Sequence, residues 1–146
     1  MKDTDILIER SDVSGRTAVI REEIDSVWLY LSGPGEDRPE VACWALNTSD
    51  APQAPDFAAY RSQAAPPPLP GSQLAGTPPD PGQGEWSVRW SHDGDATAAL
   101  LDGHPIAFVV AGRPRGYARY VKAGADPWAL PWDDDIFSTE FSASSS

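Results

Sequence analysis

The sequence predicts a mainly β fold in which two antiparallel β-meanders form either one curved sheet or a sandwich. Two zones, residues 1–50 and 86–122, consist of short runs rich in Ile, Val, Leu and Trp that are separated by turn residues. A proline-rich connection, residues 51–85, lies between them. We also expect two short helices, near residues 55–65 and 133–141. The chain has 146 residues, the length of one ordinary domain, so we treat it as a single folding unit.

The first zone is expected to form the first meander. Its apolar runs predict strands over residues 6–8, 17–21, 24–31 and 41–46. In the third of these runs, Val27, Leu29 and Leu31 point to one face of the strand, while Trp28 and Tyr30 point to the other. Because both faces of this strand are apolar, we expect it in the centre of a sheet.

The second zone shows the clearest alternation in the chain. Trp86, Val88 and Trp90 share one face of a strand, and polar residues lie between them on the other face. Further apolar runs predict strands over residues 96–101, 105–111 and 117–121. These strands would form the second meander.

Two dipeptides in this zone predict tight hairpin turns. Asp93-Gly94 and Asp102-Gly103 each follow one apolar run and precede the next. Both residue types tolerate the positive φ angles that a two-residue hairpin turn requires. We therefore expect positive φ angles at both positions of each pair.

The remaining segments are expected to connect or end the fold. In the proline-rich connection, the residue spacing over 55–65 allows a short helix, and residues 66–70 continue as a stiff polyproline stretch on the surface. Residues 123–141 form a C-terminal segment of turns and a helix. Residues 142–146 form a frayed tail.

Charge and composition exclude several classes of function. The chain carries 22 acidic and 11 basic residues, a net charge of −11, which opposes binding to nucleic acid or to an anionic membrane. No apolar stretch approaches the roughly 20 residues of a membrane span, and we expect a cytoplasmic protein. Cys43 is the only cysteine, so an internal disulfide and a cysteine-based metal site are excluded.

Catalytic signatures are sparse. The chain lacks the glycine-rich phosphate loops, the nucleophile elbow and the zinc-protease motif. His92 and His104 adjoin the two predicted hairpin turns, at opposite ends of the strand between them, about 20 Å apart. Glu23 and Asp25 would share one strand face about 7 Å apart, as in some glycosidases, but a solvated strand end accounts for them equally well. We expect no catalytic residue, cofactor or metal.

The best candidates for binding a partner combine tryptophan with carboxylates. Tryptophan buries a large apolar area while its N–H still finds an acceptor, so it is common at binding hot spots. The candidate residues are Trp128, Trp132, Asp133, Asp134 and Asp135 near the C-terminus, with Glu36 and Asp37 in a loop. Two structural roles remain open for the same residues: the rings cover an open end of the sheet, and the aspartates cap a helix.

These observations favour a non-catalytic, acidic binding protein. A small acidic chain with few catalytic groups suits an immunity or inhibitor protein that neutralises a basic protein such as a toxin or effector. One alternative is a carboxylate-based enzyme or small-ligand module, which requires a tryptophan-lined pocket with a desolvated carboxylate. Another is an accessory domain that joins a larger assembly through an exposed sheet edge.

Overall fold

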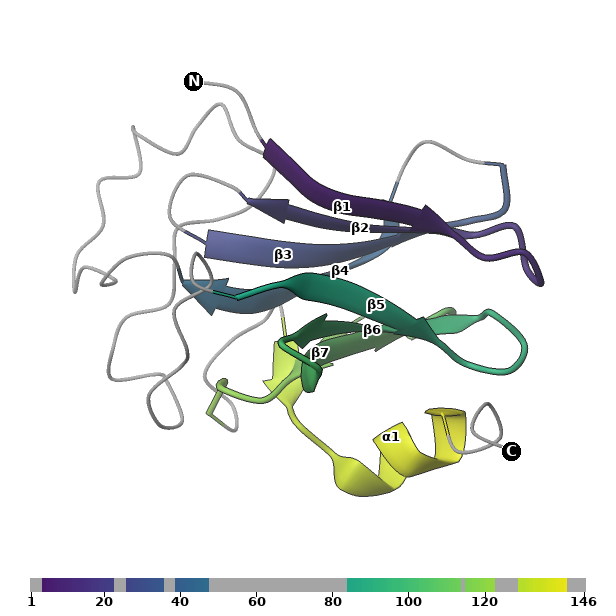
Figure 1. The fold of residues 1–146 in the computed structure, drawn as a ribbon. Helices are drawn as coiled ribbons and strands as arrows, with labels where there is room; N and C mark the ends of the chain where they lie inside the picture. Colours follow the sequence, from purple (N-terminus) through teal and green to yellow (C-terminus); the bar gives the residue numbers. More distant parts are fainter. Residues whose placement is uncertain are drawn as a thin grey trace.

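The part of the chain that the structure describes consists of two β-sheets and one helix (Figure 1). It is a computed structural model that describes residues 4–22, 26–35, 39–47, 84–113, 115–122 and 129–141. These residues form nine strands and a single α-helix. The mainly β fold class expected from the sequence is confirmed. The helix expected near residues 55–65 lies outside the described residues.

The first sheet is an antiparallel meander in the order β1-β2-β3-β4. Its strands are β1 (Thr4–Arg10), β2 (Thr17–Glu22), β3 (Ser26–Ser32) and β4 (Pro39–Asn47). Leu29 on β3 lies opposite Ile20 on β2 and Cys43 on β4, which places these three side chains on one face. All seven residues of β3 are buried, as expected for a central strand that is apolar on both faces.

The second sheet has the order β5-β6-β7-β8-β9. Its strands are β5 (Trp86–Trp90), β6 (Ala96–Leu101), β7 (His104–Val110), β8 (Gly116–Ala118) and β9 (Ala129–Pro131). The first four form the expected antiparallel meander, whereas β9 pairs with β8 in parallel. The sequence did not predict β9, because three residues are too few to show a period and Leu130-Pro131 resembles a turn. Pro131 is tolerated there because β9 is an edge strand.

The two predicted hairpin turns differ in the structure. Asp102 and Gly103 both have positive φ angles, 52° and 82°, and join β6 to β7 as expected. At the other turn only Gly94 has a positive φ, 74°. Asp93 does not need one, because the turn is longer: Ser91 and Ala96 close it through a bond from the Ser91 N–H to the Ala96 carbonyl oxygen. The expectation of two positive φ angles is therefore wrong for Asp93-Gly94.

The sheets pack against each other as a sandwich, one of the two expected arrangements. A single buried cluster contains residues of both sheets, including Leu29 and Cys43 from the first and Val109 and Ala118 from the second. The sheets approach closely at Gly116 on β8, where an added Cβ would lie 2.6 Å from the Cys43 Cβ. Glycine is therefore required at this position by the spacing between the sheets.

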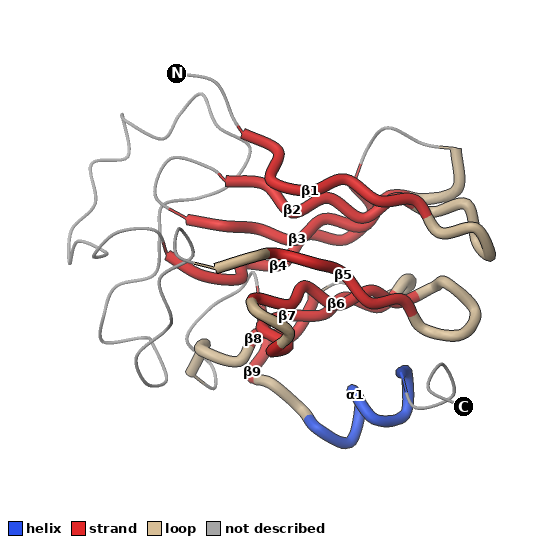
Figure 2. Tube along the Cα trace, in the orientation of Figure 1, coloured by secondary structure: helices blue, strands red, loops and turns tan. Residues whose placement is uncertain are grey.

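A second apolar cluster covers the other face of the second sheet. Helix α1 (Asp134–Phe141) lies on this face, so the described elements form three layers: sheet, sheet and helix (Figure 2). Phe108 on β7 is fully buried at its centre and contacts the rings of Tyr117, Phe137 and Phe141. Helix α1 confirms the helix expected near residues 133–141. No described helix has the length and hydropathy needed to cross a membrane.

Candidate functional site

Four of the seven candidate binding residues lie together where α1 begins. Trp132 and Asp133 immediately precede the helix, and Asp134 and Asp135 form its first turn. The other three candidates, Trp128, Glu36 and Asp37, lie outside the described residues. The described part of the site is thus a short acidic segment on the outer layer of the fold.

Trp132 is anchored by contacts within the protein. Its half-buried ring meets Phe108 edge-on at a centroid distance of 5.0 Å and lies 4.9 Å from the ring of Phe137. Its indole N–H donates to Asp134 Oδ1 at 2.6 Å. The guanidinium of Arg119 lies 4.2 Å from the ring centroid. Trp132 therefore packs on the outer face of the second sheet, whereas the structural role considered from the sequence was to cover an open end of the sheet.

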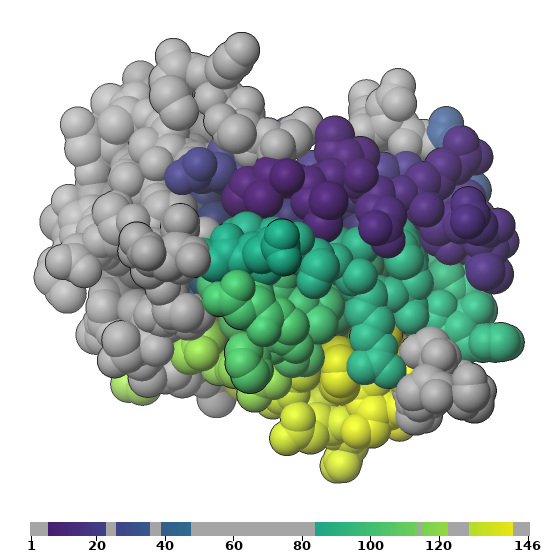
Figure 3. All heavy atoms as spheres, viewed as in Figure 1, coloured from purple at the N-terminus to yellow at the C-terminus, as the bar shows by residue number. Residues whose placement is uncertain are grey.

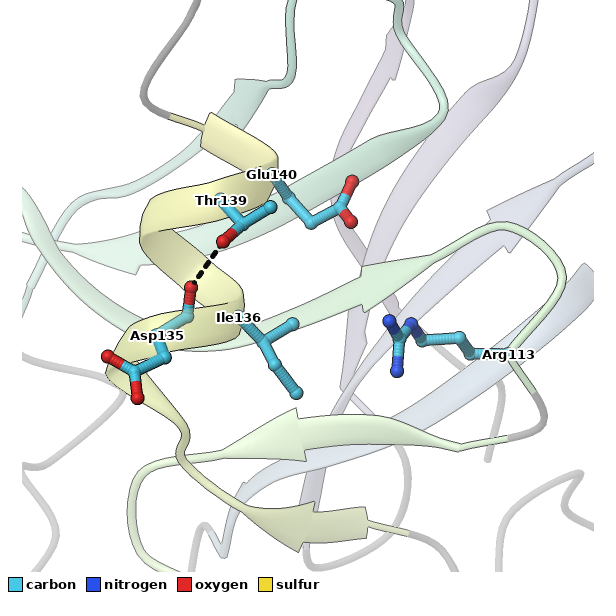
Figure 4. A pocket seen from close by; sticks show the side chains of 5 residues that line it. All are labelled: Arg113, Asp135, Ile136, Thr139 and Glu140. Carbon is cyan, nitrogen blue, oxygen red and sulfur yellow. Dashed lines mark hydrogen bonds between the residues drawn. The ribbon is translucent and has the colours of Figure 1, made fainter.

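The three aspartates have different roles. Asp133 Oδ1 accepts hydrogen bonds from the backbone N–H groups of Asp135 and Ile136, at 3.0 and 3.1 Å, and so caps the helix. Asp134 is exposed and holds the Trp132 indole. Asp135 is exposed, and its carboxylate points away from Arg113 and Ile136 (Figure 4). Two negative charges are thereby presented to solvent on a helix whose first turn is fixed.

A surface cavity of about 230 Å³ lies beside the helix. It is lined by Arg113, Asp135, Ile136, Thr139 and Glu140. Arg113 comes from the loop after β7, and its guanidinium faces Ile136 and Glu140 across the cavity (Figure 4). No pattern in the sequence predicts this cavity. Helical spacing puts Ile136 and Glu140 on one face of α1, but nothing in the sequence indicates which loop lies opposite.

Arg113 and Arg119 precede this acidic segment in the chain, and neither forms an ion pair with its aspartates. Arg119 contacts Trp132 through the ring, and its Nε donates to the Pro105 carbonyl oxygen at 2.8 Å. Arg113 Nη1 donates to the Tyr117 hydroxyl at 3.1 Å. Within the described residues, the ion pairs are instead formed by Arg16. Arg119 therefore packs against the C-terminal segment through Trp132, whereas the hydrogen bonds of both arginines go to strands of the second sheet.

A polar network joins the two sheets at the hairpin end of the sandwich. Arg16 bridges Glu40 at 2.9 Å and Asp95 at 3.0 Å, and the Ser14 hydroxyl donates to the Gly94 carbonyl oxygen at 2.7 Å. The hydrogen bond from Arg16 holds the pKa of Glu40 below its ordinary value. Burial lowers the pKa of Arg16, but hydrogen bonds to both carboxylates outweigh it and the net shift is upward. These contacts fix the ends of the sheets relative to each other.

The same end shows where the edge strands of the sheets meet. The Trp90 indole N–H on β5 donates to Glu9 Oε2 on β1 at 2.9 Å. Figure 3 shows the residues of these two strands in contact on one face of the molecule. Trp90, which the sequence places on the apolar face of β5, packs against the cluster between the sheets. Its role is therefore structural.

The catalytic candidates are separated in the structure. His92 and His104 are both exposed, at opposite ends of β6, as the sequence predicted. Glu23 and Asp25 lie outside the described residues. Among the described residues, no three His, Cys, Asp or Glu side chains are grouped so as to hold a metal ion. The structure brings none of the described candidates together into an acid–base pair.

Comparisons with protein-family models, with curated proteins and with solved structures found no match to this chain.

Proposed function

We propose that this chain is a non-catalytic, acidic binding protein of the immunity or inhibitor type, which neutralises a basic protein partner. The observation that carries the proposal is the pair of exposed carboxylates, Asp134 and Asp135, on a helix packed firmly onto the second sheet. The net charge of −11 surrounds this segment with a field that attracts a cationic surface.

Rigidity of the helix matters for this function. Asp133 caps α1, and Phe141, the last residue of the helix, is buried. Both ends of the helix are therefore held on the sheet. A preorganised surface loses little conformational entropy when a partner binds. Opposite charges on the two partners would speed their association, and the fit between the surfaces would set the lifetime of the complex.

A second candidate function is supported by exposed apolar side chains. Ile8 is 58% exposed on the edge strand β1, and Val13 is 71% exposed in the turn that follows. Exposed apolar residues at a sheet edge are a feature of surfaces that pair with another chain. They favour an accessory assembly domain, which uses the first sheet rather than α1.

The enzyme alternative has less support from the described residues. It requires a tryptophan-lined pocket that contains a desolvated carboxylate. The cavity beside α1 has no tryptophan among its lining residues. Among the described residues, the carboxylates of Glu40 and Asp93 have pKa values below their ordinary values, because each accepts hydrogen bonds.

Affinity capture followed by a binding titration tests the proposal. The tagged chain is used to capture proteins from native lysate at low and moderate salt, and each captured protein is then purified and titrated. We expect one basic protein that binds in a 1:1 complex, associates more slowly as salt is raised and loses its own activity when bound. Capture of only acidic or neutral proteins, or a basic protein whose activity is unaffected, would contradict the proposal.

A further inference from the structure

We propose that the cavity between Arg113 and Glu140 is an anchor site for a single Lys or Arg side chain of a protein partner. The inference rests on the proposed function and extends it, because it identifies which part of the α1 surface takes the partner's charge. Asp135 also lines the cavity, but its carboxylate lies on the other side of α1 from Arg113 and Glu140, so Glu140 is the carboxylate that faces Arg113 (Figure 4).

The size of the cavity favours a side chain over a free ligand. Pockets for drug-sized ligands and cofactors usually enclose about 300–1,000 Å³. The cavity beside α1 measures about 230 Å³ and is open to solvent on one side. A space of this size holds one long side chain whose backbone stays outside, which is how an anchor residue enters a protein interface.

The chemistry of the walls favours a cationic side chain. Glu140 is half-buried, and its carboxylate forms no hydrogen bond or ion pair with another described residue. Its charge is therefore available to an ammonium or guanidinium group that enters the cavity. Ile136 provides an apolar floor for the methylene stem of that group.

Arg113 forms the opposite wall of the cavity, where its positive charge partly offsets the attraction of Glu140 for a cation. Its Nη1 is held by the Tyr117 hydroxyl, and it forms no ion pair with Glu140. A guanidinium has five N–H donors, so others remain to bind carbonyl oxygens of the partner's backbone. An acidic side chain would also meet Arg113, but Glu140 and the net charge of −11 oppose it.

A matched pair of small probes tests the site on the purified full chain. Nα-acetyl-arginine amide carries the proposed group, and Nα-acetyl-citrulline amide has nearly the same shape without the charge. Each is titrated at millimolar concentration while the backbone amide signals of Thr139 and Glu140 are followed by NMR. We expect saturable shifts with the arginine probe and binding of the citrulline probe that is about tenfold weaker, since a charge-assisted hydrogen bond is lost.

Two variants test whether Glu140 causes the preference for the arginine probe. Glu140→Gln keeps the size of the side chain and removes its charge, so the preference for the arginine probe should disappear. Asp12→Asn makes the same change of charge at an exposed residue of the β1–β2 turn, and the preference should remain. Equal binding of the two probes to the unmodified chain would overturn the proposal, as would a preference that survives Glu140→Gln.

Failure of the anchor site can be distinguished from failure of the proposed function. If a basic partner is captured and binds Glu140→Gln as tightly as the unmodified chain, the function stands and the anchor site is wrong. If the probes behave as expected but no basic protein is inhibited by the chain, the anchor site stands and the neutralising function is wrong.

Discussion

The ring of Trp132 meets the ring of Phe108 at a centroid distance of 5.0 Å and an interplanar angle of 84°. This edge-on contact joins the segment before α1 to the middle of β7, the central strand of the second sheet. The contact makes Phe108 the point through which the acidic segment is fixed to the fold. Changes at Phe108 should therefore affect both stability and the presentation of the helix.

Replacement of Phe108 should destabilise the protein strongly. Phe108→Ala removes a fully buried ring that contacts four other aromatic rings, and such changes cost about 3–5 kcal/mol. Phe108→Leu fills more of the space and should cost less. Urea unfolding followed by tryptophan fluorescence measures both variants. Equal, small losses in the two would show that the aromatic cluster does not stabilise the fold.

Loss of the helix cap should be measurable at Asp133. Asp133→Ala removes the acceptor of two backbone N–H groups and should lower the free energy of unfolding by about 1 kcal/mol. Asp133→Asn keeps an oxygen at the same position and should lose only a fraction of this. Circular dichroism at 222 nm and urea unfolding are the measurements. A loss in the Asn variant as large as in the Ala variant would contradict the capping role.

The ion pair between Arg16 and Glu40 should make the free energy of unfolding depend on pH in the acidic range. The folded-state pKa of Glu40 is below its ordinary value of 4.5, so its ionised form stabilises the fold above that value. This contribution is lost as the pH falls from about 4.5 through the lower pKa of the folded state. In Arg16→Gln, the urea midpoint should therefore decline less steeply over this acidic range.

Arg10→Gln provides the control for this pH experiment. Arg10 is exposed, and no ion pair to it is found among the described residues, so its removal should leave the acid dependence unchanged. Identical pH profiles for Arg16→Gln and the unmodified chain would show that the Glu40 bridge does not contribute to stability.

Charge removal at the start of α1 should slow binding of a basic partner. Asp134→Asn together with Asp135→Asn removes two exposed charges, while the amide oxygen introduced at position 134 can still accept the bond from the Trp132 indole. We expect the association rate at low salt to fall several-fold, with little change at high salt. Stopped-flow mixing measures the rate. The matched control, Asp12→Asn with Glu85→Gln, changes the total charge equally on other parts of the surface; an equal effect would exclude a local role for α1.

The faces of a strand and the type of a tight turn could be predicted from the sequence, because a few consecutive residues determine them. The alternation of Trp86, Val88 and Trp90 predicted the faces of β5, and Asp102-Gly103 predicted the turn between β6 and β7. In both cases neighbouring residues carry the information, because side-chain direction and φ preference are properties of a few consecutive residues.

Other features depend on residues that are far apart in the chain. The parallel pairing of β9 with β8 and the position of Arg113 opposite Glu140 have no local pattern that indicates them. The hydrogen bond from the Ser14 hydroxyl to the Gly94 carbonyl oxygen, which joins turns of the two sheets, also has no local signal. Each of these contacts depends on how the sheets and the helix pack together.

By itself, the sequence determined the mainly β class, the apolar faces of the strands, the capped C-terminal helix and the negative charge of the surface. Only the tertiary structure decided that the sheets form a sandwich, that Trp132 is held within the aromatic cluster and that a cavity opens between Arg113 and Glu140. The physical reason is that periodicity, capping and net charge are carried by neighbouring residues or by composition. A cavity between two elements depends instead on how closely their side chains pack.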